Sequence, residues 1–154
     1  MLLRFNRPVV NVSDIERSLA FYRDKLGMKV VSDNRTTDAD KQGTKAVLEK
    51  AFNVSNLDLR WVVLEVAGEG AGREVELLQW NNPKPPGLPG SRNCYDSEVA
   101  WCAFRVQGLR AFYDKLASQG VKFLAPLAPF NSERGICYAL DPDGYIVELG
   151  GSLQ

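Results

Sequence analysis

The stretches LAFYRDKLGMKV at residues 19–30 and RAFYDKLASQGVKF at residues 110–123 decide the fold, because they are two versions of one pattern. Each contains Ala-Phe-Tyr, then Asp-Lys-Leu, then a glycine and a lysine between apolar residues. An internal repeat of this kind predicts two copies of one structural unit. In each copy the spacing of the apolar residues indicates an amphipathic helix that leads into a strand.

Outward from these stretches, each copy predicts a strand, a helix and three strands. In the first copy, Ser13 and Glu16 form a capping box for a helix over residues 13–26, and Gly27 ends it. The strands of the first copy are predicted at 5–12, 28–34, 57–68 and 73–80. Those of the second copy are predicted at 98–106, 121–126, 134–140 and 145–151, with its helix at 108–120. The fold class is therefore α+β, with two tandem βαβββ modules that form a curved mixed sheet around a cleft.

The first module covers residues 1–80 and the second covers 98–154. Between them, residues 81–97 hold four prolines and two glycines, which is typical of an extended linker. A short helix at 45–52 lies within residues 35–52, a segment that the second module lacks. This segment is either a lid or specificity element, or a plain surface excursion.

The composition excludes several classes of partner. Nineteen basic residues balance nineteen acidic ones and no long run of like charge occurs, so we expect neither nucleic acid nor anionic membrane as a partner. Only two leucines precede Arg4, which predicts neither a signal peptide nor a membrane anchor. The three cysteines lack metal-ligand spacing, so they are predicted to be reduced thiols of a cytoplasmic protein.

Side chains two apart on a strand share a face, which separates the core from the cleft. Val10 and Val12 are predicted to face the helix of the first module, and Val147 and Leu149 that of the second. The predicted cleft residues are the alternate ones on four strands: Arg7, Val9 and Asn11; Glu74, Glu76, Leu78 and Trp80; Trp101, Ala103 and Arg105; Ile146 and Glu148.

Four segments in this order resemble the vicinal oxygen chelate superfamily of glyoxalase I, bleomycin-resistance proteins and extradiol dioxygenases. They are VVNVSDIERSLAFYRDKLGMKV (9–30), VELLQW (75–80), CAFRVQGLRAFYDKLASQGVKF (102–123) and YALDPDGYIVEL (138–149). The resemblance covers about residues 5–150. It implies that the metal ligands of metal-using members fall at Arg7, Glu76, Trp101 and Glu148.

This sequence departs from the family pattern at two of those positions, and it contains no histidine at all. Arginine offers no usable lone pair and the indole N–H only donates, so the set predicts no transition-metal site and no cofactor. We expect Arg7 to take the place of the cation and to bridge Glu76, Glu148 or both. In the alternative, Arg7 points to solvent and the two glutamates are solvated in an open cleft.

Three functions follow from these residues. The first is binding of a small, partly apolar molecule in a metal-free cleft, as in sequestration or resistance. The second is a metal-independent lyase or isomerase with Glu76 or Glu148 as general base and Arg7 beside the resulting anion. The third is a metal-dependent lyase or dioxygenase with an unusual ligand set.

The ligand itself is predicted to touch Asn11, Arg105 and the flat walls of Trp80 and Trp101, although both tryptophans would also suit ordinary core packing. A homodimer is expected, because the edges of each module leave unpaired strand groups.

Overall fold

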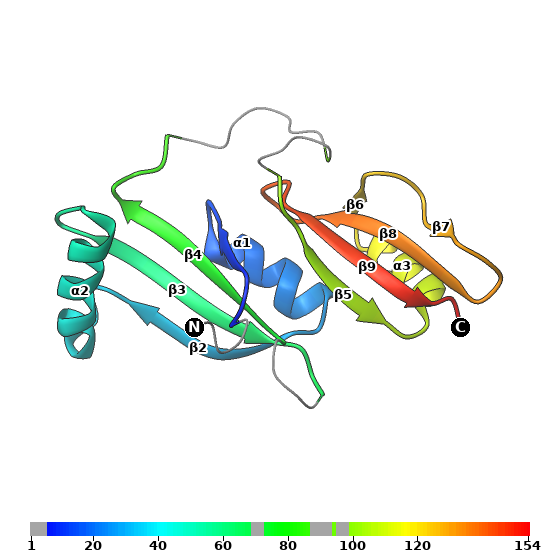
Figure 1. The fold of residues 1–154 in the computed structure, drawn as a ribbon, viewed down its shortest axis with the longest axis horizontal. Coiled ribbons are helices and arrows are strands. Elements are labelled where there is room, and N and C mark those ends of the chain that lie inside the picture. Colours follow the sequence, from blue (N-terminus) through cyan, green and yellow to red (C-terminus); the bar gives the residue numbers. More distant parts are fainter. Residues whose placement is uncertain (1–5, 69–72, 87–93, 95–98) are drawn as a thin grey trace, which may run out of the picture. The chain divides into compact units, whose positions relative to one another are not determined.

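The computed structural model describes residues 6–68, 73–86, 94 and 99–154. The chain divides into two compact units, Met1–Leu88 and Pro89–Gln154, with the division inside the proline-rich segment. Each unit carries its own sheet and its own helix on one face of that sheet (Figure 1). We describe the two units separately.

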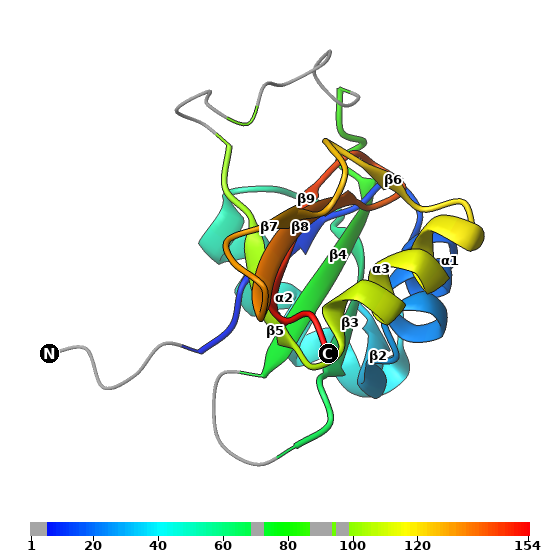
Figure 2. The same cartoon turned by 90° about the vertical axis from the view of Figure 1, so that its right-hand side faces the viewer.

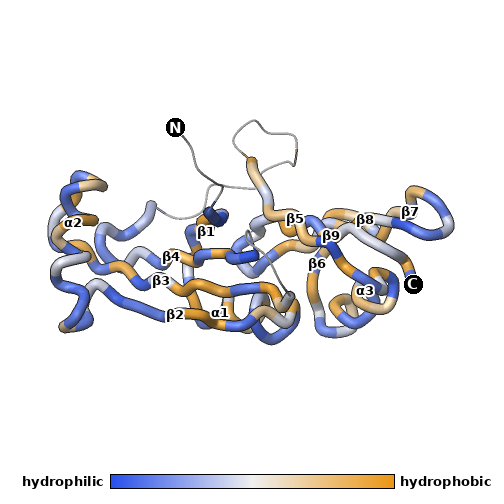
Figure 3. Tube along the Cα trace, turned by 60° about the horizontal axis from the view of Figure 1, so that its bottom comes forward, coloured by the Kyte–Doolittle hydropathy of each residue, from blue (hydrophilic) through white to orange (hydrophobic). Residues whose placement is uncertain are grey.

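The first unit builds a four-stranded mixed sheet in the order β1-β4-β3-β2. Its strands are β1 (Val9–Asn11), β2 (Lys29–Arg35), β3 (Asp58–Glu65) and β4 (Glu74–Asn82). Strand β1 runs parallel to β4, whereas the other neighbours are antiparallel. Buried residues alternate with partly exposed ones over the first four positions of β4, whereas β3 carries a buried apolar run at residues 62–64. Figure 3 shows the apolar stretches of the sheet in orange. That alternation leaves one face for the helix and one for other contacts.

Strand β1 is shorter than the predicted 5–12. Pro8 has no N–H to give to a ladder, and its carbonyl accepts from the Glu76 amide at 3.1 Å just before the strand begins. The predicted faces are confirmed, since Val10 and Val12 are buried while Val9 is 51% exposed. Residue 5 lies outside the described residues.

The N-cap of the first helix lies one residue later than predicted. Asp14, and not Ser13, caps α1 (Ile15–Leu19), because its Oδ1 accepts from the amides of Glu16 at 2.8 Å and Arg17 at 3.2 Å. The chain then continues as a π-helix, η1 (Ala20–Lys25). Gly27 follows in the left-handed region of the backbone, with φ of 80°. The wider turn rotates the following residues, so that Tyr22 is buried but Leu26 is only half-buried.

The hydroxyl of Ser18 faces the core of the first unit without a hydrogen-bond partner among the described residues. A buried unsatisfied hydroxyl costs stability, and alanine is the best helix former, so we expect Ser18→Ala to raise the free energy of unfolding by about 0.5–1 kcal/mol. Urea unfolding would measure this change. Ser118→Ala is the matched control, because the exposed Ser118 hydroxyl donates to the Lys115 carbonyl at 2.7 Å and its loss should not stabilise. A destabilised Ser18→Ala protein would contradict the prediction.

Arg60 on β3 ties the sheet to its helix through two carboxylates. It pairs with Glu16 of α1 at 2.7 Å and with Asp33 of β2 at 2.6 Å. The hydrogen bond from Arg60 holds the pKa of Asp33 below its ordinary value. A carboxyl group whose pKa is depressed in the folded protein stabilises above its unfolded pKa, and this contribution is lost as the pH falls through the folded pKa.

We therefore expect Asp33→Asn to destabilise the protein at pH 7 by no more than about 1 kcal/mol, because the Asp33 side chain is 40% exposed to solvent. The difference from the unmodified protein should shrink as the pH falls from about 4 toward 2. Urea unfolding at several pH values would measure it. Asp114→Asn, at an exposed position of the second unit, is the matched control and should change stability at pH 7 by less than about 0.5 kcal/mol.

The second unit repeats the plan with the sheet order β5-β9-β8-β6, and β7 also pairs with β8. Its strands are β5 (Cys102–Val106), β6 (Lys122–Phe123), β7 (Ala128–Pro129), β8 (Arg134–Leu140) and β9 (Ile146–Ser152). Helix α3 (Leu109–Ser118) lies on one side of β8 and β9 in Figure 2. Strand β5 runs parallel to β9, as β1 does to β4, so the two first strands are equivalent.

The core of the second unit forms from the predicted residues. Val147 and Leu149 are buried, as is Leu116 of α3. Cys102 and Cys137 are buried free thiols, and burial raises the pKa of Cys137 to about 11, so both act as small apolar side chains.

The turn before β9 uses the Asp-Pro-Asp-Gly sequence at residues 141–144. Asp141 is buried and its Oδ1 accepts from the amides of Asp143 at 2.9 Å and Tyr145 at 2.7 Å, while Gly144 has φ of 83°. The turn thereby starts β9 and fixes which of its residues face the core.

The α+β class with mixed sheets is confirmed. The enclosure of a common cleft by the two modules stays a prediction, because each unit is described by itself. In the described part of the chain, no helix is long and apolar enough to cross a membrane.

Candidate functional site

Arg7 lies over the two acidic residues of β4 that face away from α1. Its Nη1 donates to Glu74 Oε2 at 2.6 Å, and its Nε lies 3.2 Å from Glu76 Oε2. The Nε–H is buried but does not point well enough at Glu76 to form a hydrogen bond. The contact with Glu76 is therefore an ion pair without a hydrogen bond. The contact with Glu74 is a charge-assisted hydrogen bond, which is the stronger of the two interactions.

This arrangement bears on the expected cation replacement. The guanidinium does pair with Glu76, and the alternative in which Arg7 points to solvent is wrong, since only 24% of its side chain is exposed. Glu74 is a further partner that sequence reasoning did not include in the site. Its position two residues before Glu76 on the same face was the available signal. A bridge from Arg7 to Glu148 stays a prediction.

Glu148 on β9 has a neutral donor in place of an arginine. Trp101 Nε1 donates to Glu148 Oε2 at 3.1 Å. Tyr138 stands opposite Glu148 on β8. Burial, and after it the charge of Glu148, raises the pKa of Tyr138, so its hydroxyl stays protonated at neutral pH.

Tyr138 was missed at the level of sequence. The signal was its place between Cys137 and Ala139, both buried, which puts Tyr138 on the face of Glu148. Register then decides the contact, because β8 and β9 pair these two residues directly.

The two units place their pairs at equivalent positions. Val9 pairs with Glu76 in the first unit and Ala103 pairs with Glu148 in the second. Arg7 and Trp101 each stand two residues before that partner, just ahead of β1 and β5. Each unit thus places a side chain that carries N–H groups beside a carboxylate of its last strand, as an ion pair in the first unit and as a hydrogen bond in the second.

Trp80 and Asn11, both predicted ligand contacts, meet in the first unit. Trp80 Nε1 donates to Asn11 Oδ1 at 2.9 Å, and the Trp80 ring makes an edge contact with Phe52 at a centroid distance of 5.2 Å. Phe52 ends helix α2 (Gln42–Phe52), which follows a short 3₁₀ turn, η2 (Ala39–Lys41), and starts three residues earlier than predicted. The inserted segment therefore reaches a residue of the candidate site.

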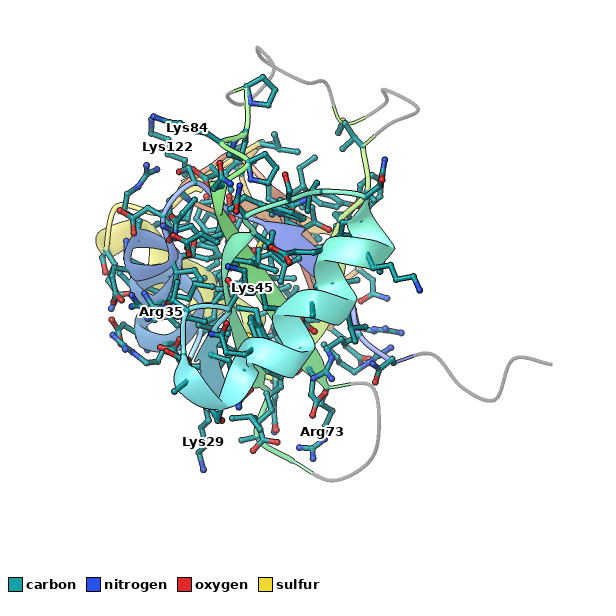
Figure 4. The ribbon with its side chains drawn as sticks, turned by 90° about the vertical axis from the view of Figure 1, so that its left-hand side faces the viewer. Lys29, Arg35, Lys45, Arg73, Lys84 and Lys122 are labelled. Carbon is teal, nitrogen blue, oxygen red and sulfur yellow. The ribbon has the colours of Figure 1, made fainter. Side chains whose placement is uncertain are left out.

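Helix α2 packs no buried side chain against the rest of the first unit. None of its residues is buried, and Val47 is 66% exposed. Figure 4 views the structure from the side of α2, with Lys45 labelled on the helix. Besides Phe52, its anchors are the bond from the Leu57 amide to Glu49 Oε1 at 2.8 Å and the bonds from Gln42 to two backbone carbonyls. In the same view the basic residues Lys29, Arg35 and Arg73 of the first unit lie apart from one another.

Arg105 lies on β5 opposite Gly150 and is exposed. It forms no ion pair within the described residues of its unit. Its side chain remains available to an anionic part of a ligand, but it forms no hydrogen bond with Trp101 or Glu148.

The residues at the family's metal positions do not fit a transition metal. Arg7 and Trp101 have no usable lone pair, and both lie against the carboxylates that would otherwise bind the ion. Across residues 6–68, 73–86, 94 and 99–154, no cluster of three His, Cys, Asp or Glu residues could hold a metal ion.

The family is shown by sequence. The model of the Glyoxalase/Bleomycin resistance protein/Dioxygenase superfamily matches residues 4–149. The chain belongs to this superfamily. A lactoylglutathione lyase of Schizosaccharomyces pombe is 27% identical to it over 146 residues. That match covers 95% of this chain but only 44% of the yeast protein, so the chain spans less than half of that relative.

Solved structures agree on the fold of the superfamily. A glyoxalase family protein from Bacillus cereus matches with a TM-score of 0.78 and 14% identity, over 100% of this chain and 97% of the other. Glyoxalase I of Leishmania major matches with a TM-score of 0.63 and 21% identity, over 96% of this chain and 86% of the other. At these identities the likeness shows the fold alone.

Proposed function

We propose that this protein binds a small, partly apolar molecule without a metal ion, in the manner of sequestration or resistance. The observation that carries the proposal is the pairing of Glu76 with Arg7 and of Glu148 with Trp101. Both carboxylates at the family's metal positions already interact with donors of their own unit. The sheet faces that carry them can therefore meet a ligand without an ion between protein and ligand.

The side chains beside these carboxylates suit such a ligand. Trp101 is 41% exposed, and Trp80 stands half-buried on the corresponding face of the first unit. Aromatic side chains supply flat apolar contact, and the carboxylates and Asn11 supply polar contacts that orient a bound molecule. The 45–52 part of α2, through Phe52, would contribute to specificity for that molecule.

A metal-independent lyase or isomerase is the second candidate, and the similarity to a lactoylglutathione lyase favours it. Here Glu76 or Glu148 would be the general base, with Arg7 beside the anion that forms. The pairing with Arg7 weighs against Glu76, since a carboxylate in an ion pair gives up part of that contact when it takes a proton. A metal-dependent lyase or dioxygenase has no fitting ligand set in the described residues.

One experiment separates binding from catalysis. Purified protein is incubated with a library of small molecules and examined by native mass spectrometry, and the released molecules are then identified. We expect stoichiometric complexes whose ligand is recovered unchanged. A lactoylglutathione lyase assay, run with and without added zinc or nickel, should give no turnover. Conversion of a ligand without metal would establish the second candidate, and turnover that requires metal would contradict both.

A homodimer and a cytoplasmic location complete the proposal. Strands β1 and β2 lie at the edges of their sheet, with one row of backbone groups each that the sheet does not pair. Light scattering should therefore give twice the 17.1 kDa mass of the chain. A mass of one chain at high protein concentration would count against the dimer.

A further inference from the structure

The carboxylate of Glu148 carries a charge that its own unit does not neutralise. Its donor Trp101 and its cross-strand neighbour Tyr138 are both neutral groups. Among the described residues of the second unit it has no ion-pair partner. Glu76, at the equivalent position of the first unit, lies against the guanidinium of Arg7. The two carboxylates therefore differ, because Glu76 has a cation beside it and Glu148 has none in its own unit.

The rings of Trp101 and Tyr138 also form a corner beside this carboxylate. The rings of Trp101 and Tyr138 have centroids 6.3 Å apart and planes at 82° to each other. Small residues lie next to them on the same face, since Ala103 pairs with Glu148 and Gly150 follows two residues later on β9. Those small side chains leave room above the sheet, and a methyl group built on Gly150 meets only ordinary contacts at 3.9 Å or more.

We propose that the Trp101–Tyr138–Glu148 cluster binds an organic cation, namely an alkylated ammonium group. Aromatic rings attract cations through the negative potential of their faces, and perpendicular rings can enclose the methyl groups of such a cation from two sides. The carboxylate supplies the counter-charge. An alkylated ammonium is less strongly hydrated than a metal ion or a primary ammonium, so it loses less on leaving water. This inference rests on the proposed metal-free binding function and names the chemical class of the ligand.

The test compares two probes of one shape and different charge. Choline carries a trimethylammonium group, and 3,3-dimethylbutan-1-ol replaces its nitrogen by carbon. Calorimetric or NMR titration of the full chain should show saturable choline binding and at least tenfold weaker binding of the neutral alcohol. Glu148→Gln and Trp101→Leu should each weaken choline binding at least tenfold. Glu133→Gln removes an exposed carboxylate of the same unit and should change it less than twofold.

Other results would overturn the inference. Equal binding of choline and the alcohol would mean an apolar surface without charge recognition. Absence of saturable choline binding, or choline binding that Glu148→Gln leaves intact, would equally contradict it. The failures stay distinguishable. If the library screen yields a ligand but choline does not bind, this inference fails and the proposed function stands. If purified protein carries a stoichiometric metal ion, the proposed function fails whatever choline does.

Discussion

Replacement of Gly151 by alanine is expected to destabilise the protein by roughly 3 kcal/mol or more. A methyl group at this position would lie 1.8 Å from the carbonyl oxygen of Val106 and 2.8 Å from its carbonyl carbon. Gly151 pairs with Val106 across the parallel β5–β9 ladder, so the obstacle is backbone and not a flexible side-chain end. Strand β5 would have to move away from β9 to make room, which would break the hydrogen bonds between them.

Gly150→Ala is the matched control for this substitution. The nearest atoms to its added methyl group would be the Gly135 carbonyl oxygen at 3.9 Å and Ile136 at 4.0 Å, which are ordinary contacts. Urea unfolding of the two variants should show a change of less than about 1 kcal/mol for Gly150→Ala. An insoluble Gly151→Ala protein beside a soluble Gly150→Ala protein would support the account. A Gly151→Ala protein as stable as the unmodified one would show that β5 does not approach β9 this closely.

Removal of Arg7 is the second substitution with a large expected effect. Arg7→Ala leaves Glu74 and Glu76, two residues apart on one face, without the cation that now lies between them. We expect a loss of about 1–3 kcal/mol, below the range for a fully buried pair, because the side chains involved are 22–36% exposed. Arg105→Ala removes an exposed arginine that has no ion pair among the residues that the structure describes, and it should change stability by less than about 0.5 kcal/mol.

A double replacement separates charge from packing. If the loss comes from two uncompensated carboxylates, Glu74→Gln and Glu76→Gln in the Arg7→Ala background should restore most of it. Urea unfolding is measured for the unmodified protein, Arg7→Ala, the Glu74→Gln and Glu76→Gln double variant, and the triple variant. The four free energies of unfolding give the coupling between Arg7 and the two carboxylates. A loss that persists in the triple variant would mean that the aliphatic part of Arg7, and not its charge, stabilises this face.

Much of the fold could be predicted from the repeat and from alternation along strands. The burial of Val10 and Val12 follows from a period of two, and so does the shared face of Glu74 and Glu76. The partial exposure of Leu26 could not be predicted in this way. The π-helix Ala20–Lys25 adds a residue to the turn, and helical spacing alone gives no sign of it.

The candidate site was predictable in its residue types and in the pairing of Arg7 with Glu76, but not in the pairing of Trp101 with Glu148. Family position placed Arg7, Glu76, Trp101 and Glu148, and the structure pairs them as Arg7 with Glu76 and Trp101 with Glu148. The roles of Tyr138 and Phe52 depend on strand register and on the path of α2 between β2 and β3. Register depends on long-range pairing, which the local sequence does not specify.

Metal-free binding requires that Arg7 and Trp101 stand where metal-using members of the family have metal ligands. Calorimetric titration with zinc and nickel, run on the unmodified protein and on Arg7→His, tests this requirement. Histidine at this position removes the guanidinium and adds a neutral imidazole next to Glu74 and Glu76, which together could bind an ion. We expect no binding to the unmodified protein and measurable binding to Arg7→His that Glu76→Gln abolishes. A stoichiometric zinc or nickel ion in the unmodified protein, lost on replacement of Glu76 or Glu148 by glutamine, would contradict this expectation.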